Sequence, residues 1–136
     1  MIYEDFVTYD QAKVLKELGF DWKCNHWYHP LEPEKIIECQ TYCNHNSFER
    51  PYSAPTLAQA QKWLRETNNV IIEIYCFKCI VKLLVWNFTI VDNNDKELIE
   101  PEHENPFNTY EQSLSAGIDK ALELLKERKD ENMDNT

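Results

Sequence analysis

The amino-acid sequence predicts an α+β fold in which three helices accompany a three-stranded antiparallel meander, in the order α-loop-α-β-β-β-α. Three segments with helical periodicity each begin with the capping-box pattern T-x-x-Q. A stretch rich in β-branched and aromatic residues, 70–100, lies between the second and third of these segments. Short turns divide this stretch, and strands that short turns join must be antiparallel. Helices can then cover one face of the sheet, which is an α+β arrangement.

Each predicted helix begins at a threonine that is followed three residues later by a glutamine. In a capping box, each of these two side chains satisfies a backbone N–H that the first helical turn leaves unpaired. Gly117 lies inside the third helix, where a glycine costs about 1 kcal/mol relative to alanine, so we expect another element to approach the helix closely there. The helices are predicted at about Tyr9–Leu18, Leu57–Thr67 and Tyr110–Glu127.

Residues 70–100 are predicted to form the sheet. A tight connection near Lys78-Cys79 separates the first two strands, and the turn-forming sequence DNND, at 92–95, separates the second strand from a short edge strand. The strands are predicted at Val70–Phe77, Ile80–Val91 and Lys96–Ile99.

Residues 20–54 fit neither pattern, and only Lys35–Tyr42 has the character of a strand. A segment of this length without structure of its own is unusual inside a compact domain, so additional strands, packed aromatic side chains or a metal ion must hold it. We therefore predict a single α+β domain over residues 1–128 with an irregular segment at 20–54. A flexible acidic tail is predicted at 129–136.

The composition argues against several classes of function. Twenty-four acidic against fourteen basic residues leave a net charge of −10, which is unfavourable for binding nucleic acid. With only two glycines, the chain has no glycine-rich loop that could cradle a phosphate. The start of the chain lacks the pattern of a signal peptide, and its most apolar stretch, 80–91, is too short to span a membrane. Together with five cysteines, an odd number, this predicts a cytoplasmic protein with free or metal-bound thiols.

Three cysteines and three histidines between residues 24 and 45 are candidate ligands of a zinc ion. Zinc takes four nitrogen or sulfur ligands in a tetrahedron, usually from two pairs of closely spaced residues. The spacings here are irregular, C-x-H-x-x-H and C-x-x-x-C-x-H, and are not the C-x-x-C pairs typical of zinc sites. The alternative is that the cysteines are small core residues and the histidines lie on the surface. The candidate ligands are Cys24, His26, His29, Cys39, Cys43 and His45.

No pattern in the sequence identifies a catalytic site. The C-x-x-C motif Cys76–Cys79 lies in or between strands, whereas the redox-active form of this motif opens a helix. A cysteine nucleophile with a histidine base would use Cys24 or Cys43, but no spacing singles out such a pair. The sequence therefore favours a non-catalytic protein that binds a protein partner or a ligand and needs no cofactor. A domain held by structural zinc is the alternative, a cysteine-dependent enzyme is the third hypothesis, and a homodimer is compatible with each.

Four blocks of the sequence together resemble a known family. They are YSAPTLAQAQKWLRE at 52–66, NTYEQSLSAG at 108–117, VTYDQA at 7–12 and LGFD at 18–21. With these blocks the chain, from about residue 7 to 126, resembles a family of small uncharacterised proteins from gut Bacteroidetes and their phages. The resemblance implies a cytoplasmic protein encoded by a phage or prophage, and it transfers no activity and no site residues. Small accessory proteins of phages often act by binding a host protein or ligand, which the resemblance also implies here.

Overall fold

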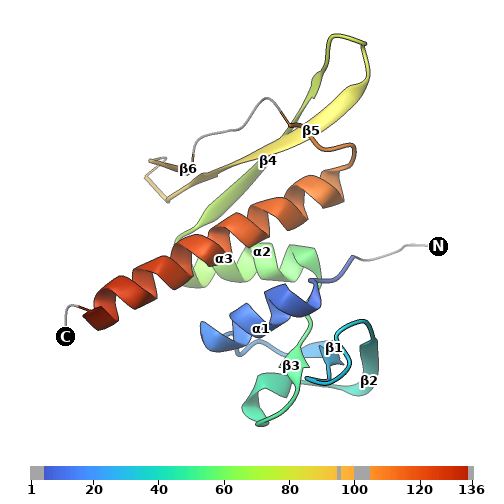
Figure 1. The fold of residues 1–136 in the computed structure, drawn as a ribbon, viewed down its shortest axis with the longest axis vertical. Coiled ribbons are helices and arrows are strands. Elements are labelled where there is room, and N and C mark those ends of the chain that lie inside the picture. The colour runs from blue at the N-terminus through green and yellow to red at the C-terminus, as the bar shows by residue number, and fades with distance from the viewer. Residues whose placement is uncertain (1–4, 95, 100–104, 135–136) are drawn as a thin grey trace. The chain divides into compact units, whose positions relative to one another are not determined.

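The computed structural model of the chain describes residues 5–94, 96–99 and 105–134, which form an α+β fold with three α-helices and two three-stranded antiparallel sheets (Figure 1). The chain divides into two compact units, one made of Met1–Ala60 with Leu124–Thr136 and the other of Gln61–Glu123. The predicted α+β class is confirmed, whereas the single domain over 1–128 stays a prediction. The elements are α1 (Tyr9–Glu17), β1 (Cys24–Tyr28), β2 (Ile36–Cys43), the 3-10 helix η1 (His45–Ser47), β3 (Tyr52–Ser53), α2 (Leu57–Asn68), β4 (Ile71–Lys78), β5 (Leu84–Val91), β6 (Glu97–Ile99) and α3 (Tyr110–Asp134).

The first unit contains a sheet that the predicted order of elements lacks. In this sheet β1 lies between β2 and β3, and it pairs with both in the antiparallel direction. The predicted order α-loop-α-β-β-β-α is therefore wrong, because additional strands, one of the alternatives that the sequence left open for residues 20–54, form there. β2 covers most of the stretch with strand character at Lys35–Tyr42. The physical reason is that β3 has only two residues, and β1, with the sequence CNHWY, does not alternate between apolar and polar residues as a half-buried strand usually does.

Helix α1 is anchored by one local and one distant set of hydrogen bonds. Thr8 Oγ1 accepts from the Gln11 N–H at 3.1 Å and the Thr8 N–H donates to Gln11 Oε1 at 2.9 Å, which confirms the predicted capping box. Gly19, with φ of +92°, follows the helix in the left-handed conformation that commonly ends helices. Lys16 Nζ donates to three backbone carbonyls of the 48–51 loop, at 2.7, 2.8 and 2.9 Å. A single ammonium group thus ties this loop to α1.

The segment between β2 and β3 is held by the side chain of Asn46, in η1. Asn46 Nδ2 donates to the Phe20 carbonyl at 2.9 Å, and Asn46 Oδ1 accepts from the Ser53 N–H at 2.8 Å. Nearby in the same unit, the buried Tyr28 hydroxyl donates to the Val7 carbonyl at 2.8 Å. These bonds join β1 and β3 to the segments that flank α1.

The second unit contains the predicted meander, with strand order β4-β5-β6. β4 and β5 pair without interruption from Ile71↔Val91 to Lys78↔Leu84. β5 begins at Leu84 and not at Ile80, so the connection between the two strands is longer than predicted. After β5, Asp92 Oδ1 accepts from two backbone N–H groups, at 2.9 and 3.0 Å, and closes the predicted turn at 92–95, of which residue 95 lies outside the described residues.

Helix α3 approaches the meander closely at Gly117, as the sequence predicts. A Cβ atom built at this position would lie 2.7 Å from Ile72 Cγ2 and 3.3 Å from Phe88 Cγ. The helix continues to Asp134, beyond its predicted end at Glu127, so the described part of the predicted acidic tail is helical. Within the described residues, no helix has the length and apolar character needed to cross a membrane.

Candidate functional site

Three of the six predicted metal ligands lie together in the first unit. Cys24, at the start of β1, is the direct cross-strand partner of Cys43, at the end of β2. His45 follows in η1, with Nε2 2.9 Å from the Cys24 carbonyl oxygen. The Cys43 sulfur lies 3.6 Å from Nδ1 and 3.7 Å from Nε2 of the same ring. These contacts bring the Cys43 side chain to the His45 ring, whereas the contact of His45 with Cys24 is to the backbone carbonyl of Cys24.

The other three predicted ligands make different contacts. The His26 ring lies against the Phe6 ring with 4.2 Å between centroids, and His29 Nδ1 accepts from the Leu31 N–H at 3.1 Å. Cys39 lies half-buried in β2. Within the ranges 5–94, 96–99 and 105–134, no group of three or more His, Cys, Asp or Glu side chains has an arrangement that could hold a metal ion. The zinc site stays a hypothesis, for which native mass spectrometry of protein purified without chelator is the test.

Neither Cys24 nor Cys43, the two cysteines considered as nucleophiles, has the geometry of an activated nucleophile. Burial raises the pKa of the Cys24 thiol, and the nearby Cys43 adds to this increase against the lowering effect of hydrogen bonds. A thiol with a raised pKa is a poor source of the thiolate that reacts. The Cys43 sulfur is almost equally far from both nitrogens of His45, so it cannot lie along the lone pair of either. This pair is therefore not aligned for proton transfer.

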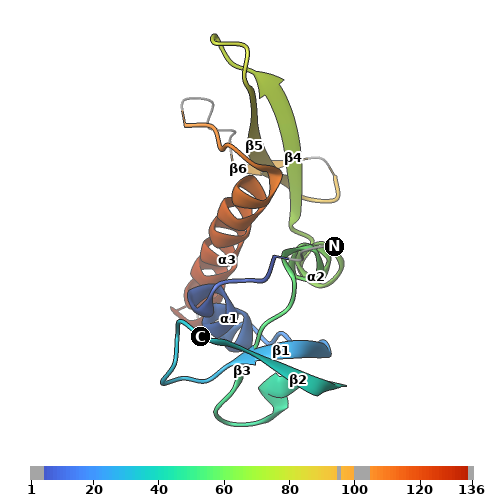
Figure 2. The same ribbon diagram turned by 90° about the vertical axis from the view of Figure 1, so that its right-hand side faces the viewer.

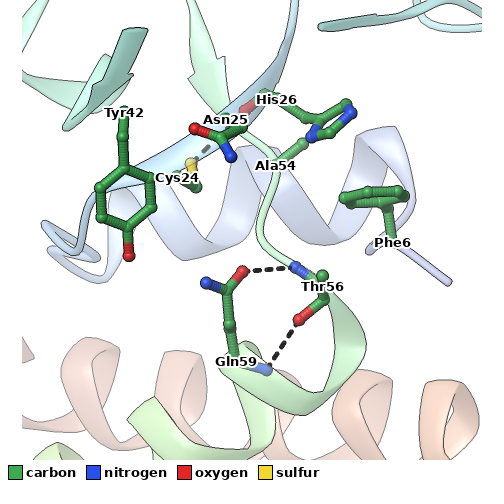
Figure 3. Close-up of a pocket in the computed structure, with 8 residues that line it drawn as sticks. All are labelled: Phe6, Cys24, Asn25, His26, Tyr42, Ala54, Thr56 and Gln59. Atoms are coloured by element: carbon green, nitrogen blue, oxygen red, sulfur yellow. Dashed lines mark hydrogen bonds between the residues drawn. The ribbon is translucent and has the colours of Figure 1, made fainter. Parts of the chain in front are cut away.

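A small pocket opens beside Cys24 (Figure 3). It has a volume of about 80 Å³ and is lined by side chains from β1, β2 and the start of α2. Two of its polar side chains are already paired at the start of α2, because Thr56 Oγ1 accepts from the Gln59 N–H at 3.1 Å and Gln59 Oε1 accepts from the Thr56 N–H at 2.9 Å. A space of this size holds a few water molecules. We therefore do not assign a ligand site to it.

The strongest candidate site is the end of the β4–β5 hairpin, Lys78–Leu84, which we call the hairpin tip. In the second unit, the hairpin extends well past β6 and past the beginning of α3 (Figures 1 and 2). Four aliphatic side chains are gathered on it with high exposed fractions: Ile80 at 102%, Val81 at 70%, Leu83 at 64% and Leu84 at 53%. Exposed apolar side chains are ordinary when scattered, whereas a contiguous group of this kind marks an interaction surface.

Backbone hydrogen bonds close the hairpin tip, but it lacks the residue types that usually form turns. The Cys79 N–H donates to the Leu83 carbonyl at 3.0 Å, and the Lys82 N–H donates to the Cys79 carbonyl at 2.8 Å. Lys82 adopts φ of +62°, a left-handed conformation that costs a non-glycine residue about 1 kcal/mol. Hairpins of this kind usually place Gly, Asn or Asp in such positions. Residues that conflict with their local structure commonly indicate a functional requirement.

The charge of the hairpin also differs from that of the rest of the chain. Residues 74–91, the longest stretch without an acidic residue, contain Lys78 and Lys82 as their only charged residues, in a protein of net charge −10. Both lysines are exposed, one at the beginning of the hairpin tip and one within it. The hairpin tip thus combines exposed aliphatic side chains with two positive charges.

The sequence analysis did not identify the hairpin tip as a site, because its apolar residues were assigned to the beginning of a strand. The signal was present in the sequence: an apolar run that must contain a reversal of the chain but has no turn-forming residue. No family model matches this sequence, and no curated protein and no solved structure is significantly similar to it. The assignment of the site therefore rests on the geometry and chemistry of its residues.

Proposed function

We propose that this protein is a non-catalytic binding protein that inserts its hairpin tip into an apolar recess on a partner protein. The observation that carries the proposal is the group of four adjacent exposed aliphatic side chains, Ile80, Val81, Leu83 and Leu84. Full burial of one such side chain contributes about 1.5 to 3 kcal/mol. Four of them at the centre of an interface are therefore enough to dominate the binding free energy, after the cost of association.

The lysines specify which recess fits. Lys78 precedes the aliphatic group and Lys82 lies within it, and the nearest acidic residues along the chain are Glu73 and Asp92. A recess with carboxylates on its rim would complement this charge and disfavour other partners. The strongly negative remainder of the chain would be repelled by the same partner, so that contact is directed to the hairpin tip. The resemblance to phage proteins supports a cytoplasmic host protein as this partner.

The test compares capture of partners by matched variants. The wild-type protein, an Ile80→Ser/Leu83→Ser variant and an Leu31→Ser/Phe48→Ser control are each immobilised and exposed to lysate of the cells in which the gene is naturally expressed. The control also removes two exposed large apolar side chains, but from the first unit. The wild type and the control should retain the same protein, and the hairpin-tip variant should lose it.

Direct contact is tested by placing a photo-crosslinking amino acid at Val81. Crosslinking should join this position to the captured protein, and mass spectrometry of the product should locate an apolar recess bordered by Asp or Glu. The proposal fails if the hairpin-tip variant, confirmed as folded by circular dichroism, captures the same partner as strongly as the wild type does. Because the substituted side chains are exposed, we expect both variants to fold.

A further inference from the structure

An irregularity in the first unit brings two cysteines opposite each other. The pairing of β1 with β2 is regular at His26↔Glu38, and continuing this register would place Gln40 opposite Cys24. The register instead shifts between Cys24 and His26, so that Cys43 becomes the partner of Cys24. Such irregularities re-aim particular side chains and are typical of functional positions in sheets. The shift thus has a specific result, a pair of cross-strand thiols.

The positions of these two residues suit a disulfide bond. Directly opposed residues of antiparallel strands have Cα atoms about 4.5 to 5.5 Å apart, and disulfides usually join Cα atoms about 4.4 to 6.8 Å apart. Both thiols are free in this structure. The Cys24 sulfur is held towards the His26 carbonyl oxygen, at 3.4 Å, and it lies beside the small open pocket (Figure 3). At such a separation of Cα atoms, the bond can form by rotation of the two side chains.

We propose that Cys24 and Cys43 are a dithiol pair that closes to an intramolecular disulfide by exchange with a low-molecular-weight disulfide, such as oxidised glutathione. The half-buried Cys43 reacts first, because Cys24 is buried. The other cysteines have no such partner in register. Cys76 lies opposite Trp86 in the β4–β5 ladder, and Cys39 lies in the part of β2 where the register shifts.

The exchange proceeds in two steps that balance. The Cys43 thiolate attacks one sulfur of the small disulfide, which forms a mixed disulfide on Cys43 and releases one small thiolate. The Cys24 thiolate then attacks the Cys43 sulfur, which forms the intramolecular bond and releases the second small thiolate. The two released thiolates take up the protons that the two cysteines lost. Two electrons thus pass from the protein to the small disulfide, and an excess of small thiol reverses the reaction.

The experiment treats the folded, reduced protein with oxidised glutathione and follows its intact mass and its peptides. The wild type should lose two hydrogens and yield a peptide that links Cys24 to Cys43. A Cys39→Ser/Cys76→Ser/Cys79→Ser variant should react in the same way. In that triple-variant background, Cys24→Ala should stop at one glutathione adduct on Cys43.

Two results would overturn the inference. One is a stable glutathione adduct on Cys43 in the wild type, since Cys24 would then fail to reach it. The other is a disulfide that mainly joins a different pair. Treatment in urea is the control for specificity, because the unfolded chain should distribute its bonds among all five cysteines. The peptide map of the triple variant keeps the test valid if the Cys24→Ala variant does not fold.

Discussion

Replacing Gly117 by alanine sets two opposing effects against each other. Gly117 lies in α3 and faces the meander of the second unit. The added methyl carbon would lie 2.7 Å from Ile72 Cγ2 and 3.3 Å from Phe88 Cγ. Carbon atoms pack best at about 3.5 to 4.0 Å, so the first of these separations is a severe overlap. The same substitution also removes the conformational cost of a glycine inside a helix.

The magnitudes decide which effect is larger. Alanine is favoured over glycine in a helix by about 1 kcal/mol, and overpacking a well-packed core costs about 1 to 3 kcal/mol. Ile72 is buried, and its methyl group sits on a β-branched carbon whose rotamer is restricted, so it cannot easily move aside. We therefore expect the clash to prevail, with a net loss of about 1 to 2 kcal/mol and a decrease in melting temperature of roughly 5 °C.

Urea unfolding, monitored by circular dichroism, measures this change, and a second substitution tests its cause. Ile72→Leu moves the branch from the β to the γ carbon and so removes the Cγ2 methyl that meets the new atom. The double variant Gly117→Ala/Ile72→Leu should recover about 1 kcal/mol relative to the sum of the single changes. If Gly117→Ala alone makes the protein more stable, helix propensity prevails and the close approach is not the constraint that we infer.

Three further predictions concern the first unit. Lys16→Met keeps the aliphatic stem but removes the ammonium group that binds three carbonyls of the 48–51 loop. Thermal unfolding should show that the free energy of unfolding falls by about 1 to 2 kcal/mol, a value that allows for the partial exposure of these bonds. An equal loss of stability in Lys13→Met would refute a specific role for Lys16. Asn46→Asp replaces the donor to the Phe20 carbonyl by an acceptor and should cost about 2 kcal/mol in chemical denaturation, more than Asn44→Asp does. The pKa of the Cys24 thiol is raised in the folded state, so the unfolded chain loses this proton more easily as the pH rises. The stability that buried Cys24 contributes is therefore fully present below the ordinary thiol pKa of 9.0 and is lost at higher pH. The difference in unfolding free energy between wild type and Cys24→Ala should therefore shrink above pH 9, and a constant difference would contradict the argument.

Local interactions made part of the fold predictable from sequence. In a capping box the two side chains bind backbone groups only three residues away, so the pattern is complete within four residues. Thr8 with Gln11 and Thr56 with Gln59 form both bonds of the motif, and Thr109 Oγ1 accepts from the Gln112 N–H. The meander was predictable for a similar reason, because β-branched runs and the turn after β5 are also local signals.

The second sheet and the candidate site depend on distant residues. No local signal predicts that the register of β2 shifts, because the shift is defined only by pairing with β1. Lys16 binds carbonyls more than thirty residues away, and nothing in its own neighbourhood identifies it as an anchor. The same limit applies to the six candidate metal ligands, because spacing along the chain does not reveal which residues of β1 and β2 are paired.

The sequence by itself determined the α+β class, the starts of the helices, the close approach at Gly117 and the negative charge, because each follows from a short pattern or from composition. Only the tertiary structure decided that Cys24 meets Cys43 and that four aliphatic side chains of the hairpin tip are left exposed. An apolar run has the same sequence whether its side chains are buried in a sheet or are exposed to solvent at the end of a hairpin. Its exposure is decided by where the chain reverses and by which other elements cover it.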